Sequence, residues 1–131
     1  MNHLRHVSLL LLLLLPTLVA SKLLAETSDE KEIFSVLDNF MTSFSESDPI
    51  GHAATYHVPH FRLARGSMSN WETIEDVVTA HKRIFRNLSE TDWHHSEWIE
   101  RIVIGITDKK AHVATRVGRF REDGSQIVNF E

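Results

Sequence analysis

Residues 93–126, WHHSEWIERIVIGITDKKAHVATRVGRFREDGSQ, decide the fold of this chain. The stretch 93–107 is rich in β-branched and aromatic residues and predicts a long strand, which ends at a polar turn over 108–110. The stretch 111–121 predicts a second long strand, and Glu122-Asp123-Gly124-Ser125 predicts a hairpin turn into a third strand that starts at Gln126. The sequence therefore predicts an antiparallel meander at this end of the chain.

A long helix is expected well before this meander. Thr27 and Glu30 have the spacing of a capping box, and apolar residues then recur with helical period, which predicts a helix over 29–45. A short second helix is expected over 50–56, ending before Pro59.

The middle of the chain predicts an extended stretch over 60–65 and a turn over 66–69. Ser69 and Glu72 repeat the capping-box spacing before a second apolar stripe, so we expect another long helix over 70–88. Helices followed by an antiparallel meander predict an α+β domain, in which the helices cover one face of a curved sheet.

Residues 1–25 have the pattern of a secretory signal peptide. A positive charge precedes an apolar run over 7–20, which at about 14 residues is shorter than the roughly 20 that span a bilayer. Cleavage is expected after Ala20 or Ala25, which leaves a folded domain over 26–131. We therefore expect a secreted or periplasmic protein with no stable membrane insertion after cleavage, and an uncleaved membrane anchor is the alternative.

Composition excludes several classes of function. The chain has 131 residues, which suits one domain, and a formal net charge of −4 that leaves no basic surplus for nucleic acid. It contains no cysteine, which excludes disulfides, thiol catalysis and cysteine-based zinc sites.

The layout resembles the nuclear transport factor 2-like superfamily, and specifically its SnoaL-like branch. The resemblance rests on the helices over 29–45 and 70–88, the stretch 60–65, the strand opened by Trp93-His94-His95-Ser96, and the segments 108–114 and 119–124. It implies a cone, in which a sheet wraps around the long helices and encloses a mostly apolar pocket. Members include ketosteroid isomerase, scytalone dehydratase and limonene epoxide hydrolase, and also binding domains without chemistry, so the fold does not give the function.

The resemblance also predicts that the sheet is unfinished. SnoaL-like relatives continue the third strand and add another, so we expect that this chain lacks its last strand or strands. An unpaired apolar edge over 126–131 favours poor solubility or strand exchange, and we expect a domain extended by about 20 residues to be stable and dimeric.

Three residues are candidates for proton transfer: Asp38, His81 and His95. His81 stands where the helical stripe predicts an apolar residue, so it either bonds a buried carbonyl or lines a pocket. His94 and His95 are consecutive in a predicted strand, where alternation points one of them at the interior. Asp38 lies at the edge of an apolar stripe, where a raised pKa suits a general base, although such a carboxylate often simply reaches solvent.

Six residues are candidates for ligand binding. The chain has one tyrosine, so any phenol that bonds a ligand must be this one, and the aromatic and cationic residues supply pocket walls or hold an anion. The candidates are Tyr56, His60, Trp71, His94, Trp98 and Arg116.

His52, His57 and His60 suggest a zinc site, since three imidazoles suffice for catalytic zinc. Their spacing crosses a predicted helix end and Pro59, with no acid between them, so we expect no metal and no cofactor.

Three functions remain open. The first is an exported domain that binds a small apolar or aromatic molecule. The second is a cofactor-independent dehydratase, isomerase or cyclase that uses a histidine and Asp38. The third is a non-catalytic dimerisation module, and for the whole protein we expect a homodimer.

Overall fold

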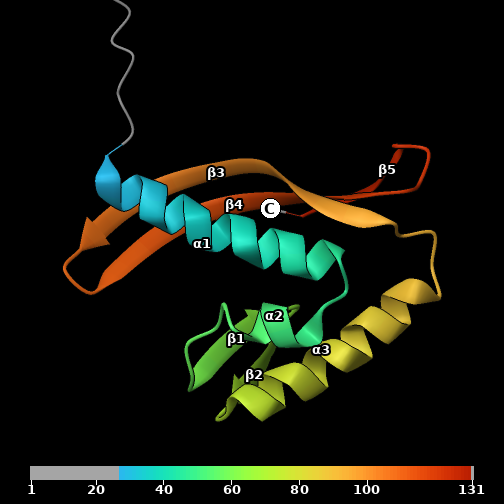
Figure 1. The fold of residues 1–131 in the computed structure, drawn as a ribbon, viewed down its shortest axis with the longest axis horizontal. Helices are drawn as coiled ribbons and strands as arrows, with labels where there is room; N and C mark the ends of the chain where they lie inside the picture. Colours follow the sequence, from blue (N-terminus) through green and yellow to red (C-terminus); the bar gives the residue numbers. More distant parts are fainter. Residues whose placement is uncertain (1–26, 131) are drawn as a thin grey trace, which may run out of the picture.

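The computed structural model describes residues 27–130, which form three helices and five strands. Figure 1 shows these elements coloured along the chain. Their bounds are α1 Ser28–Ser45, α2 Pro49–Ala53, β1 His60–Ala64, β2 Ser67–Trp71, α3 Ile74–Ser89, β3 His95–Thr107, β4 Lys110–Phe120 and β5 Gln126–Phe130. The expected signal peptide over 1–25 lies outside the described residues.

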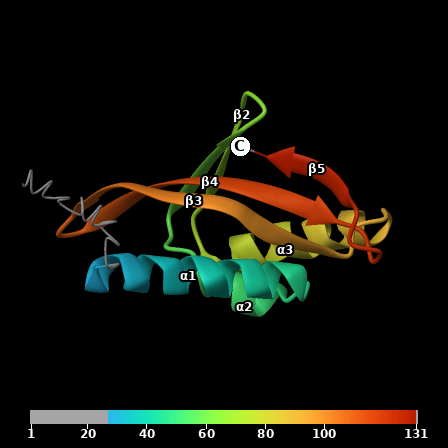
Figure 2. The same cartoon turned by 90° about the horizontal axis from the view of Figure 1, so that it is seen from above.

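The predicted meander is confirmed. Strands β3, β4 and β5 form an antiparallel sheet in this order, and the register pairs His95 with Phe120 and Thr107 with Lys110. Figures 1 and 2 show α1 lying along the long hairpin of β3 and β4. The helices precede this sheet, which confirms the α+β class, and a separate sheet of β1 and β2 is not hydrogen-bonded to it.

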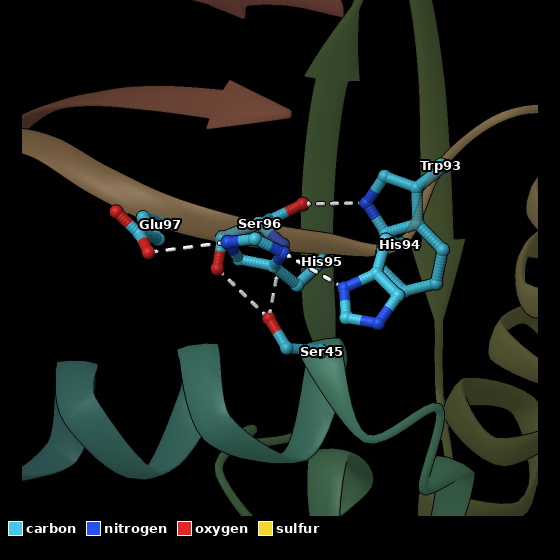
Figure 3. Close-up of polar contacts among 6 residues, drawn as sticks. All are labelled: Ser45, Trp93, His94, His95, Ser96 and Glu97. Atoms are coloured by element: carbon cyan, nitrogen blue, oxygen red, sulfur yellow. Dashed lines mark hydrogen bonds and ion pairs between the residues drawn. The ribbon is translucent and has the colours of Figure 1, made fainter. Parts of the chain in front are cut away.

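Ser45 of α1 and Trp98 of β3 each make hydrogen bonds between the helix and the strand. Ser45 Oγ donates to the Ser96 carbonyl at 2.8 Å and accepts from the Ser96 N–H at 3.1 Å, as Figure 3 shows. The Trp98 indole Nε1 donates to the Leu37 carbonyl at 3.0 Å. Because side chains alternate along a strand, Ser96 and Trp98 define the face of β3 that α1 covers.

The first two helices begin at side-chain caps. The predicted capping box of Thr27 and Glu30 is present at the start of α1. The Asp48 side chain caps α2, and Pro49 is well placed in the first turn because its missing N–H has no helical partner to lose. Helix α2 ends at Ala53, so Tyr56 lies beyond it rather than within a helix over 50–56.

The predicted start of the last helix is wrong. Helix α3 begins at Ile74, because Thr73 and Asp76 form its capping box. The Asp76 carboxylate accepts from the Thr73 N–H at 2.9 Å, and Thr73 Oγ1 accepts from the Asp76 N–H at 3.2 Å. Ser69, the expected cap, belongs instead to strand β2.

A hairpin replaces the expected turn over 66–69. Ser69 pairs with Arg62 of β1, and the chain reverses at Arg65 and Gly66. Both turn residues have positive φ, 51° and 74°, as the two-residue turns that match strand twist require. The turn is therefore shorter than expected, and the residues after it complete β2.

The small core lies where α2 packs on α3. Ala53 and Val77 are fully buried and Val78 nearly so, and half-buried apolar residues surround them: Tyr56, Val58 and Trp71. No helix within residues 27–130 is long and apolar enough to cross a membrane.

Candidate functional site

Two buried histidines meet the chain's one tyrosine beside the core. The Tyr56 hydroxyl lies 3.3 Å from His52 Nε2 and 3.3 Å from His81 Nε2. His52 has no exposed surface and His81 is 3% exposed. Helix α2 carries His52, the turn after it carries Tyr56, and α3 carries His81. We call these three residues the inner cluster.

The other ring nitrogens fix the tautomer of both histidines. His81 Nδ1 lies 2.8 Å from the Val77 carbonyl, and His52 Nδ1 lies 3.1 Å from the Phe40 carbonyl. A carbonyl oxygen only accepts, so His81 Nδ1 carries the proton and His81 Nε2 is an acceptor in the neutral ring. His52 Nδ1 also lies 3.1 Å from Ser43 Oγ, and we infer the same tautomer for His52 because Ser43 donates its own proton to the Asn39 carbonyl. Tyr56 has one hydroxyl proton for these two acceptors. One Nε2 therefore has no hydrogen-bond donor within the described residues.

Burial keeps the inner cluster neutral near pH 7. Desolvation, with His81 as a second cause, lowers the pKa of His52 from 6.5 to about 4. Desolvation also lowers the pKa of His81, and it raises the pKa of Tyr56 from 10.0 to about 12. The site thus offers a phenol that donates and imidazoles that accept, a combination suited to hydrogen bonding or proton transfer.

Aromatic rings line the cluster on all sides. The His52 ring centroid lies 4.3 Å from that of Phe40 and 4.5 Å from that of His81. Toward the surface, Tyr56 meets His60 at 4.8 Å, and His60 stacks on Trp71 at 5.4 Å. These outer rings are only half-buried.

Four of the predicted site residues are therefore brought together. His81, Tyr56, His60 and Trp71 form one continuous set of ring contacts. The first alternative for His81 is realised, because it bonds a buried carbonyl, and its ring also contacts the candidate binding residues. That His81 lines a pocket stays a prediction. Trp98 lies one ring further away, stacked on Phe40 at 5.8 Å.

Two other candidates lie elsewhere. Asp38 is exposed and forms an ion pair with Arg101 of β3 at 2.5 Å. Arg116 faces Glu100 at 3.7 Å. Asp38 is therefore paired with Arg101 at the edge of α1, away from the inner cluster.

His94 and His95 form a separate contact at the start of β3. His94 Nδ1 lies 3.1 Å from His95 Nδ1, and His95 Nε2 lies 3.1 Å from Glu97 Oε1 (Figure 3). The strand begins at His95, so alternation does not separate the two rings. The His95 ring stacks on Phe120 at 5.3 Å, and among the described residues neither histidine contacts the inner cluster. The structure thus does not bring Asp38, His81 and His95 to one place.

Within residues 27–130, no group of three or more histidine or acidic side chains is arranged to hold a metal ion. His52, His57 and His60 do not gather. His52 is buried in the inner cluster, while His57 is exposed and His60 stacks on Trp71.

Sequence reasoning missed His52 as a partner of Tyr56. The two are four residues apart, a spacing that places side chains on one side of a helix, and this signal was available. It also missed Ser43, whose Oγ lies 3.1 Å from His52 Nδ1 and donates to the Asn39 carbonyl at 2.8 Å. Because the Ser43 hydroxyl donates its proton to the Asn39 carbonyl, Ser43 Oγ can accept a hydrogen bond from His52 Nδ1.

The structure is that of a small α+β domain, with helices, an antiparallel sheet after them and aromatic rings around the inner cluster. The superfamily that the sequence resembles belongs to this class. A family described as NTF2-like protein (DUF6841) matches residues 29–131, and the chain belongs to this family. This confirms the superfamily, while the SnoaL-like branch stays a prediction. No curated protein and no solved structure matches the chain.

Proposed function

We propose that this protein binds a small aromatic molecule bearing a hydroxyl group, next to Tyr56 in the interior. The observation that supports this is the unequal count of donors and acceptors in the inner cluster, one phenol proton for two imidazole nitrogens 3.3 Å away. A buried acceptor without a donor is costly, and a ligand hydroxyl supplies the missing proton. The surrounding rings favour a flat apolar body.

The choice between the two histidines does not affect this argument. When Tyr56 donates to His52, the ligand donates to His81, and the reverse arrangement is equivalent. Removing either imidazole leaves one donor and one acceptor, which satisfy each other. The preference for a hydroxyl should then disappear even if an aromatic ring still binds.

The experiment compares 2-naphthol with 2-methoxynaphthalene, which has a similar ring system but no donor. We expect native protein to bind 2-naphthol at least about tenfold more tightly in calorimetric titrations. The His81→Leu variant should bind both probes alike, and His57→Leu, at an exposed position, should behave as native protein. Equal affinity of native protein for the two probes would overturn the proposal.

Catalysis is the second candidate function, and the neutral state of the cluster favours it. An unprotonated imidazole beside a protonated phenol is a base next to an acid, as dehydration, isomerisation or cyclisation without a cofactor requires. In this proposal His81 and Tyr56 act, and Asp38 does not. Native protein should exchange the α-hydrogens of 2-tetralone with D₂O faster than the Tyr56→Phe variant does, and equal rates would exclude this activity on that ketone.

We also propose that the protein works as an exported homodimer. The N-terminal pattern supports export, and the exposed side chains of Ile102 and Ile104 on β3 support association, because removing apolar surface from water is favourable. Mass measurement of protein recovered outside the cytoplasm should give a chain that starts between Ser21 and Glu26. A full-length chain in the membrane fraction would contradict export by cleavage.

A further inference from the structure

A second site lies on the outer side of α3, separate from the inner cluster. A groove of about 570 Å³ runs between β2 and α3, within the size range of small-molecule sites. No residue of the inner cluster lines it, although Trp71 borders both places.

One wall of the groove is cationic. Lys82, Arg83 and Arg86 line it, on the outward face of α3. None of the three forms an ion pair or a side-chain hydrogen bond with another described residue, whereas Arg101, Arg116 and Arg121 all face carboxylates. The chain as a whole carries a net charge of −4, so this wall is a local concentration of unpaired positive charge.

The rest of the groove is suited to an aromatic body. Trp71 is half-buried, and its indole Nε1–H donates to no other described residue. Ala80, a small and buried residue, also lines the groove. The Asp76 carboxylate lines the other end, so an anionic group is favoured only beside Arg83 and Arg86, about two and three helical turns further along.

We propose that this groove binds a small aromatic anion, with its carboxylate or phosphate on the arginines and its ring against Trp71. Arginine holds such groups through charge-assisted, often bidentate hydrogen bonds, and the indole supplies a flat surface beside them. The proposal does not depend on the function proposed for the inner cluster, because none of its anion-binding residues contacts that cluster.

The test uses phenyl phosphate, inorganic phosphate and benzyl alcohol as probes of the anion and the ring. In amide and indole NMR spectra of the unmodified protein, phenyl phosphate should shift the Trp71 indole N–H and the amides of 79–86, with half-saturation below about 1 mM. Inorganic phosphate and benzyl alcohol should each bind at this groove, as read from the amides of 82–86, at least about tenfold more weakly. Shifts spread evenly over all surface cations, or equal binding of phenyl phosphate and inorganic phosphate, would overturn the proposal.

A pair of double variants separates a site from general charge attraction. Arg83→Gln/Arg86→Gln should weaken phenyl phosphate binding at least about tenfold. Lys109→Gln/Lys110→Gln removes the same charge from the turn between β3 and β4 and should leave the affinity within about twofold of native. Equal weakening in both would mean non-specific attraction. Should the arginine variant fail to fold, the amide shifts of 82–86 in native protein still decide, because Trp71 also borders the inner cluster and these residues do not.

Discussion

The Tyr56 hydroxyl has one proton to donate and two imidazole nitrogens beside it. It is held at 3.3 Å from two imidazole nitrogens, and both rings are oriented by backbone carbonyls through Nδ1. Carbonyls of α1 and α3 thereby dictate which nitrogen accepts. Because burial excludes the charged forms, the shortage of one donor persists across the neutral pH range.

The same burial predicts a loss of stability in acid. Folded His52 has a pKa near 4 while the unfolded residue titrates near 6.5, so the unfolded state binds more protons between these values. The stabilisation is complete above pH 6.5 and falls as pH decreases toward 4, by on the order of 3 kcal/mol for His52. Urea unfolding at pH 7 and pH 4.5 measures it.

His52→Gln should remove most of this pH dependence, and His57→Gln should keep it, because His57 is exposed. His81 contributes a change of the same sign, since burial also lowers its pKa. An undiminished pH dependence in the His52→Gln protein would show that His52 does not titrate in this way.

At the scale of elements, local patterns predicted α1, β3 and β4 because each contains its own signal. The start of α3 failed because Ser69–Glu72 and Thr73–Asp76 have the same spacing, and only pairing with β1 decides between them. The candidate site followed the same rule. Residue type alone pointed to four of its members: Tyr56, His60, Trp71 and His81. Their contact with His52 depends on how α2 packs on α3, which the sequence pattern does not reveal.

The two capping boxes can be told apart by substitution. Thr73→Ala should lower the free energy of unfolding by about 1 kcal/mol, because it removes the acceptor of the Asp76 N–H. Ser69→Ala should change it by less than about 0.5 kcal/mol, since Ser69 caps no helix. Urea unfolding of both variants gives the comparison, and a larger loss at Ser69 would contradict the structure.

For the whole molecule, the outer face of the long hairpin is the distinctive surface. Ile102 and Ile104 are 51% and 70% exposed on β3. A register shift after Trp98 reverses the alternation and puts Ile102 on the face that α1 does not cover, and Ile104 lies at the second shift, between Val103 and Gly105. A second copy of the chain would remove both from water. Their burial then favours association in proportion to the apolar area hidden.

We expect Ile104→Glu to shift the sedimentation equilibrium from dimer to monomer, because a buried unpaired carboxylate opposes association. Ile50→Glu is a matched control, since Ile50 is 71% exposed on α2, outside this face. A native protein that sediments as a monomer, or equal effects of both substitutions, would contradict a dimer formed through β3.

The central claim is that the inner cluster holds a spare acceptor for a ligand hydroxyl, and nitrogen NMR of the histidine rings tests it most directly. At pH 7 we expect the rings of His52 and His81 to carry their proton on Nδ1, with both Nε2 atoms unprotonated. Addition of 2-naphthol should shift an Nε2 resonance of this pair, and 2-methoxynaphthalene should not. A proton found on either Nε2 before any probe is added, or identical spectra with the two probes, would contradict the account.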